Sequence, residues 1–166
     1  MNKLNIFTLF CLLATCSVLC AQEKKSKKER QQEHAKAVQQ MVESQNYKFV
    51  AQYALPLVGK SISLTPDYNV LVSNDTINSY LPYYGRAYVA PSNPAEGGIK
   101  FISTHFDYSL APAKKGGWTA NMTMEDTKEG IRMILSITTT GFATLSVSDN
   151  TRQSISFNGY IEERKQ

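Results

Sequence analysis

From Tyr47 onward, apolar side chains recur at every second position of the chain, which is the period of a β-strand with one buried face. The clearest row is Ile131, Met133, Leu135 and Ile137. Similar rows are Trp118, Ala120, Met122, Met124; Ala143, Leu145, Val147; and Ile155, Phe157, Gly159, Ile161. Tight turns separate the rows, and no helical pattern lies between them. Because parallel pairing needs long crossovers, residues 47–166 are predicted to form an all-β antiparallel barrel or sandwich of 8–10 short strands.

The first of these strands is expected to start at Tyr47 and to end at Pro56. Its buried row is predicted to be Tyr47, Phe49, Ala51 and Tyr53. A turn at 73–75 predicts a hairpin that leads into the most tyrosine-rich part of the chain. The Pro-, Asn- and Gly-rich stretch 91–98 is expected to be a mobile loop.

Residues 1–21 have the pattern of a secretory signal. Lys3 supplies the positive start, an apolar run follows, and Ala21 is the small residue at the expected cleavage site. All three cysteines lie in this segment, so the mature chain is expected to contain neither disulfides nor cysteine-bound zinc. The alternatives are a membrane anchor and a lipoprotein signal acylated at Cys16 or Cys20. The expected location is periplasmic or secreted, or the outer membrane if a lipid is attached.

Residues 22–46 are rich in Lys, Glu, Gln and Ala and contain neither Gly nor Pro, which predicts a charged helix or tether. Its few apolar residues form one narrow stripe, so only the C-terminal half is expected to pack on the domain: Ala35, Val38, Met41 and Val42. The formal net charge is +4, and much of the basic excess falls at 24–30. This distribution argues against nucleic-acid binding by the folded domain.

The stretch 79–88 carries four of the nine tyrosines. If it is one extended strand, its side chains fall into two rows. Leu81, Tyr83, Ala87 and Val89 form the apolar row, and Tyr80, Tyr84, Arg86 and Tyr88 form the other, with Pro82. The second row is the candidate ligand-binding surface, because tyrosine is amphipathic and arginine binds carboxylates or stacks on rings. The alternative is that the rings cap a sheet edge and Arg86 makes an internal ion pair.

Residues that could support catalysis are sparse, and the sequence assigns no catalytic residue, metal ligand or cofactor. His34 and His105 have no partner at a metal-binding spacing. The carboxylates of Asp67, Asp75 and Asp107 are candidates for acid–base chemistry, but each lies beside a turn or a strand end, where Asp is common. A turn that holds Glu125, Asp126 and Glu129 is interpreted as solvated, with a weak cation site as the alternative.

Two stretches carry a resemblance to a known family. They are 67–88, which includes Ser79-Tyr80-Leu81-Pro82-Tyr83-Tyr84-Gly85-Arg86-Ala87-Tyr88, and the run Asn150-Thr151-Arg152-Gln153-Ser154-Ile155-Ser156-Phe157-Asn158-Gly159. The chain resembles, over about 47–161, the domain-of-unknown-function family numbered 4251, which is exported by gut-type Gram-negative bacteria. The resemblance implies an envelope location and a compact β-rich fold, and it brings no activity.

These observations favour a non-catalytic binding module of the bacterial envelope. Its expected partner is a small ligand, a glycan or an envelope protein, with no nucleic acid, and with a membrane only if the chain is lipidated. A carboxylate-dependent hydrolase of the envelope and a structural accessory of an envelope complex are the alternatives. A concave aromatic floor would favour ligand binding, a converging acid pair would favour the hydrolase, and a flat apolar patch would favour a protein partner.

Overall fold

The computed structural model describes residues 26–89, 97–114 and 116–164. The expected signal segment 1–21, its cysteines and most of the expected loop 91–98 lie outside these residues. The described part has one helix, α2 (Lys27–Glu43). Its strands are β1 (Tyr47–Pro56), β2 (Ile62–Ser63), β3 (Asn69–Val72), β4 (Ile77–Leu81), β5 (Ile99–Ser103), β6 (Phe106–Pro112), β7 (Trp118–Met124), β8 (Arg132–Ile137), β9 (Phe142–Ser148) and β10 (Ile155–Glu163).

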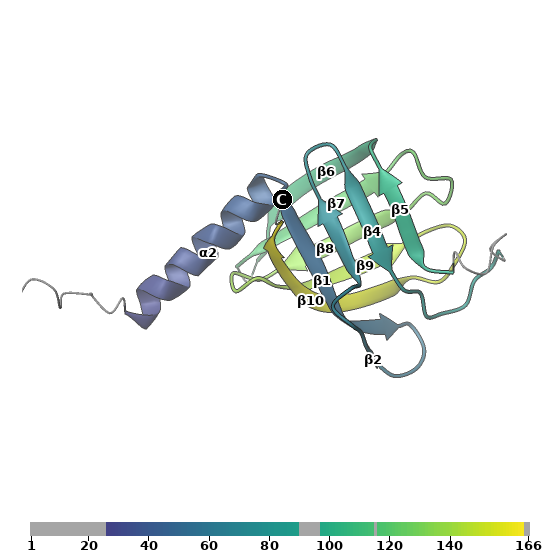
Figure 1. The fold of residues 1–166 in the computed structure, drawn as a ribbon, viewed down its shortest axis with the longest axis horizontal. Coiled ribbons are helices and arrows are strands. Elements are labelled where there is room, and N and C mark those ends of the chain that lie inside the picture. The colour runs from purple at the N-terminus through teal and green to yellow at the C-terminus, as the bar shows by residue number, and fades with distance from the viewer. Residues whose placement is uncertain (1–25, 90–96, 115, 165–166) are drawn as a thin grey trace, which may run out of the picture. The chain divides into compact units, whose positions relative to one another are not determined.

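The described strands form a single antiparallel sheet in the order β5-β4-β3-β1-β10-β9-β8-β7-β6, with β2 paired to β1. All pairs are antiparallel, as the short connections predict. The sheet curls so that β4 and β5 lie across from β7 to β9, which makes a nearly closed barrel whose edges are β5 and β6 (Figure 1). The predicted all-β antiparallel fold is confirmed.

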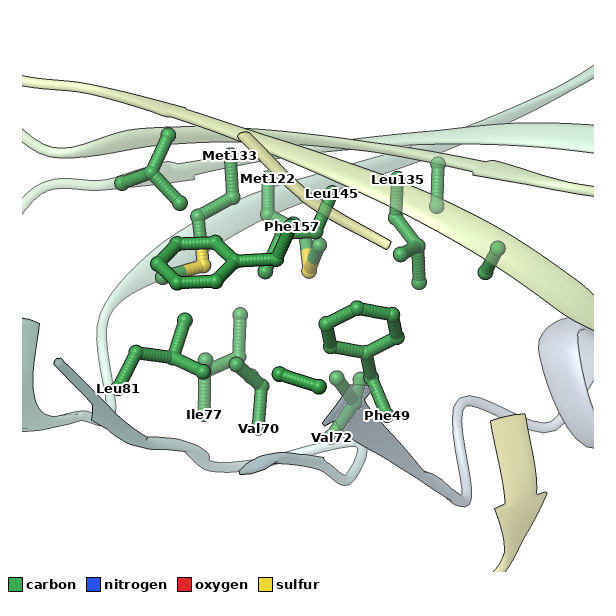
Figure 2. Packing of buried hydrophobic residues seen from close by; sticks show 14 of the residues in the cluster. Phe49, Val70, Val72, Ile77, Leu81, Met122, Met133, Leu135, Leu145 and Phe157 are labelled. Carbon is green, nitrogen blue, oxygen red and sulfur yellow. The ribbon is translucent and has the colours of Figure 1, made fainter. Parts of the chain in front are cut away.

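The core fills the space between the two sides of the barrel. Phe49, Val70, Val72, Ile77 and Leu81 point toward Met122, Met133, Leu135, Leu145 and Phe157 from the opposite side (Figure 2). Each of these side chains is at most 1% exposed. The rows predicted from the alternation at 131–137, 143–147 and 155–161 are all buried. The hydrophobic effect therefore acts on one continuous cluster that spans the sheet.

The turn between the two edge strands is fixed by a carboxylate from another turn. Asp126, between β7 and β8, accepts hydrogen bonds from the backbone amides of Thr104 and His105 and from the Ser103 hydroxyl. The Ser103 hydrogen bond is the largest cause of a lowered pKa of Asp126, which falls from 3.8 to about 2. The carboxylate thus holds one end of the open seam between β5 and β6. Asp126 is exposed, as the interpretation of a solvated turn expects, and its carboxylate in addition binds the neighbouring turn.

Helix α2 begins after Ser26, which caps it, and residues 22–25 of the predicted helix lie outside the described residues. The backbone amide of Ser26 donates to the Glu29 carboxylate, and the Glu29 amide donates to the Ser26 hydroxyl, so the two residues form a capping box. At the other end, Val38 and Val42 are fully buried. The predicted packing of only the C-terminal half is confirmed.

Helix α2 ends at Glu43, and Gln45, two residues later, has a left-handed backbone with φ of +48°. The Asn46 amide donates to the Met41 carbonyl, which is the bond pattern of a Schellman motif.

At the start of β1, burial raises the pKa of the Tyr47 hydroxyl well above 10.0. That hydroxyl lies 3.3 Å from the hydroxyl of Tyr108, which donates to the carbonyl of Val42. The buried polar atoms at this junction are therefore paired.

Because β1 contains a bulge, the predicted buried row of this strand is wrong at its last residue. The register with β10 shifts between Ala51 and Tyr53, so Gln52 and Tyr53 both face outward. Tyr53, expected in the buried row, is 48% exposed. Where β1 bends, its backbone comes so close to Gly159 that a Cβ there would overlap the Val50 carbonyl oxygen. Only glycine fits this position of β10.

Candidate functional site

The tyrosine stretch leaves the sheet halfway along its length. Strand β4 ends at Leu81, and Pro82, which has no amide proton for a ladder bond, starts an irregular segment. The prediction of one strand through Tyr88 is therefore wrong. Leu81 is buried as predicted, whereas Tyr83 is half-buried and Val89 is 61% exposed. The two predicted rows do not form faces of one sheet.

The irregular segment is instead bound to residues 149–153, which precede β10. Ala87 and Arg152 form an isolated antiparallel bridge. The amides of Tyr88 and Val89 donate to the Thr151 carbonyl at 2.8 and 3.2 Å, and the Gln153 amide donates to the Arg86 carbonyl at 3.0 Å. The two stretches on which the family resemblance rests are thus joined in space, although more than 60 residues separate them in sequence.

An ion pair with an aromatic neighbour lies at this junction. The Arg152 guanidinium contacts the Asp149 carboxylate at 2.8 Å, and these side chains are only 18% and 2% exposed. A second guanidinium nitrogen donates to the Gly98 carbonyl at 3.1 Å, and the group lies 5.1 Å from the centre of the Tyr83 ring. Asp149 also accepts bonds from Thr151 and from the Arg152 amide.

The Tyr83 hydroxyl completes the junction. It lies 2.9 Å from the Arg86 carbonyl and 3.0 Å from the Gln153 carbonyl, both of which can accept its proton. Burial raises the pKa of this hydroxyl, and the nearby Arg152 charge offsets part of the rise. We call Tyr83, Asp149 and Arg152 the junction cluster. The polar groups of this cluster already bond to other parts of the same chain, so few of their hydrogen-bonding positions remain for a ligand.

The four predicted site residues do not lie on one strand, since only Tyr80 belongs to β4. Tyr80 stacks on Tyr68 with ring centres 5.7 Å apart, and the Lys100 amine lies 4.8 Å from the Tyr80 ring. Tyr84 is partly buried against the core. Arg86 and Tyr88 are exposed on the irregular segment. Tyr80 and Tyr84 therefore do not share a surface row with Arg86 and Tyr88 as the strand prediction required.

The Arg86 side chain makes no ion pair or hydrogen bond with any described residue, so the alternative of an internal ion pair finds no partner within 26–89, 97–114 and 116–164. Its backbone, in contrast, is fixed by the Tyr83 hydroxyl and by both the amide and the side chain of Gln153. Tyr88, two residues on, is 64% exposed. This segment thus presents a guanidinium and a ring from a rigid support. We call Arg86 and Tyr88 the arginine loop.

The carboxylates proposed for acid–base chemistry come from three separate segments. Asp67 precedes β3, Asp107 is exposed on β6, and Asp75 lies in the β3–β4 turn. The Asp75 carboxylate accepts a hydrogen bond from the Ser73 hydroxyl, which lowers its pKa. In the part of the chain that the structure describes, no three His, Asp or Glu residues are grouped so that they could hold a metal ion.

Sequence reasoning missed a groove on the outer face of the barrel. It has a volume of about 440 Å³ and lies over β1, β10, β9 and the end of β8. Its lining residues are Gln52, Tyr53, Ser136, Ile137, Thr138, Phe142, Ala143, Thr144, Asn158 and Gly159. Phe142, at 61% exposed, was detectable, because it belongs to the solvent-facing row that alternates with Ala143, Leu145 and Val147. The exposure of Tyr53 could not be detected from the sequence, because the bulge that exposes it has no clear sequence signal. We call this site the outer groove.

The architecture defines a class of small, nearly closed antiparallel β-barrel domains with one N-terminal helix. A family profile described as domain of unknown function (DUF4251) matches residues 29–161, and the chain belongs to this family. The crystal structure of a DUF4251 family protein from Bacteroides eggerthii is similar, with a TM-score of 0.63 and 16% sequence identity. The match covers 78% of this chain and 87% of that chain, and it shows that the fold is shared.

Among curated proteins, none matches this sequence. Within residues 26–164, apart from the gaps in the description, α2 is not long and apolar enough to span a membrane.

Proposed function

We propose that this chain is an exported, non-catalytic binding module of the bacterial envelope that recognises an acidic group through the arginine loop. The observation that carries the proposal is the contrast at Arg86 between a fixed backbone and a guanidinium without a partner among the described residues. An unpaired guanidinium binds a carboxylate or a phosphate through two parallel hydrogen bonds. Because the loop is already ordered, binding costs little backbone entropy.

Tyr88 supports this assignment, since its exposed ring lies two residues from Arg86 on the same fixed segment. An exposed tyrosine beside an arginine is a common composition of binding surfaces. Two carboxylates that bond to other parts of the chain favour a binding module over the hydrolase alternative, because they are occupied by structural contacts. Asp126 and Asp149 each accept several hydrogen bonds and hold turns and the junction cluster together.

The test compares arginine side chains within one protein. Nitrogen-15 NMR spectra of the Nε–H groups are recorded while phosphate, and separately succinate, is added. The Arg86 signal is expected to shift and to saturate, whereas the Arg152 signal, already paired with Asp149, is expected to stay in place. Arg132, exposed on β8, serves as the control for non-specific binding.

A saturating shift with only one of the two anions would assign the loop to phosphate or to carboxylate. An Arg86 shift that stays linear and no larger than that of Arg132 would contradict the proposal. The Arg86→Gln variant is expected to lose the response, since its uncharged amide cannot replace the bidentate guanidinium.

A further inference from the structure

The outer groove has an ordered floor built from neighbouring strands. Tyr53 on β1 pairs with Asn158 on β10, Asn158 pairs with Thr144 on β9, and Thr144 pairs with Ser136 on β8. These four residues form a straight row across the sheet, and all face outward. Adjacent strands are roughly 4.8 Å apart. Polar groups are therefore presented at intervals close to the length of one sugar ring in an extended chain.

The groove is uncharged. None of the ten described residues that line it is Asp, Glu, Lys or Arg, and its exposed polar side chains carry only hydroxyl or amide groups. The Thr144 hydroxyl donates to the Asn158 carbonyl oxygen at 3.0 Å, which leaves the Asn158 amide nitrogen with its donors for a ligand. A charged ligand would find no counter-charge here, so the lining selects a neutral, hydrogen-bonding partner.

Two exposed rings flank this polar floor. Tyr53 is 48% exposed and Phe142 is 61% exposed, and both line the same groove. A purely apolar ligand would cover the rings but would leave the Asn158 amide nitrogen and the Ser136 hydroxyl without hydrogen-bond partners, which is unfavourable. A sugar satisfies both requirements, because its C–H faces stack on rings while its hydroxyl groups bond to amides and hydroxyls.

We propose that the outer groove is a binding site for a neutral saccharide chain that lies across β1, β10, β9 and β8 and stacks on Tyr53 and Phe142. The site is separate from the arginine loop. Phe142 is the first residue of β9 and Asp149 of the junction cluster follows its last residue, so about 23 Å of extended strand lies between them. The proposal therefore does not depend on the function assigned to Arg86.

The test is affinity gel electrophoresis of the chain in gels that contain one polysaccharide each. The neutral probes are mannan, dextran, xyloglucan and a mixed-linkage β-glucan, and the charged probe is alginate. We expect at least one neutral probe to retard the native protein; retardation by alginate is expected to come from its carboxylates and to be unchanged in the double variant described next. The Tyr53→Ala/Phe142→Ala double variant is expected to bind that probe roughly a hundredfold more weakly, or roughly tenfold for each ring removed.

Matched controls separate a lost site from a lost fold. Both rings are exposed, so the double variant is expected to melt within a few degrees of the native protein. Tyr80→Ala removes a similarly exposed ring from the other side of the barrel and should leave the retardation unchanged.

Three results would overturn the proposal. The first is that no neutral probe retards the native protein, and the second is that the double variant is retarded as strongly as the native protein. The third comes from light scattering during size-exclusion chromatography. If the native protein is a dimer and the double variant a monomer, then the rings form an interface between two copies and not a saccharide site.

Discussion

Replacing Asp149 by Asn tests whether the junction cluster holds the fold. The carboxylate is 2% exposed and is the counter-charge of Arg152, which is itself only 18% exposed. Removing one partner of a buried ion pair costs on the order of 3–5 kcal/mol, and the residual solvent contact of Arg152 lowers the expected loss to about 2–4 kcal/mol. In a domain of this size such a loss corresponds to a lower melting temperature by roughly 6–12 °C.

The assay is urea unfolding followed by far-ultraviolet circular dichroism. The midpoint of Asp149→Asn is expected to fall while the slope with urea stays constant, since the surface exposed on unfolding does not change. Asp107→Asn, an exposed carboxylate on β6, is the matched control and should lie within about 0.5 kcal/mol of the native protein. A loss below about 1 kcal/mol for Asp149→Asn would refute the structural role.

A second substitution measures the interaction energy between Asp149 and Arg152 apart from their other contacts. Arg152→Met removes the buried cation, and in the Asp149→Asn background it should cost less than in the native background by roughly 1–3 kcal/mol. Strictly additive losses would mean that the two groups act independently. The Arg152 hydrogen bond to Gly98 is lost in both backgrounds and cancels in the comparison.

Four further outcomes are expected. The pKa of Asp126 is lowered from 3.8 to about 2 on folding, so its contribution to stability is complete above pH 3.8 and is lost as the pH falls toward 2. The melting temperature of Asp126→Asn should accordingly lie below that of the native protein above pH 3.8, and this difference should vanish as the pH falls toward 2. A difference that does not change with pH would contradict the prediction. Leu81→Ala should cost about 2–5 kcal/mol in urea unfolding, because the side chain is fully buried, while Arg86→Ala should stay within about 1 kcal/mol; equal losses would show Arg86 to be structural. Gln45→Gly should raise the free energy of unfolding by about 0.5–1 kcal/mol, since glycine adopts the positive φ without steric cost, and a lower urea midpoint would contradict this. Intact-mass measurement of envelope protein should give a chain that starts at Gln22, whereas an acylated cysteine of the signal segment would establish the lipoprotein alternative.

The fold could be predicted because most strands follow a strict two-residue period. The rows at 131–137, 143–147 and 155–161 are buried without exception. The stripe on α2 was equally readable, since Val38 and Val42 are the apolar positions that the helical period brings to one side. In both cases the signal is local, so that neighbouring residues determine which face is buried.

The candidate site was harder to predict because its geometry depends on contacts between distant residues. The bulge in β1 places Tyr53 outside, and nothing near it in sequence marks that change. Pro82 does signal the end of β4, but the path of the following residues depends on Asp149 and Arg152. Only Phe142 could have been found from the sequence, as an aromatic residue in a row that otherwise holds Thr144 and Ser146.

The residues that make this chain recognisable as a family member include those that hold its fold. Tyr83 and Arg152 belong to the two stretches of resemblance, and both are engaged with other parts of the same chain. A side chain whose hydrogen-bonding groups are already paired has little to offer a ligand, so a recognisable motif does not by itself locate a binding site. The ligand contacts proposed above fall instead on exposed side chains that have no partner among the described residues, and Arg86, on the same motif, meets that condition. Tyr53 and Phe142 meet it outside the motif, so members of one family could share the junction cluster and still differ in what they bind.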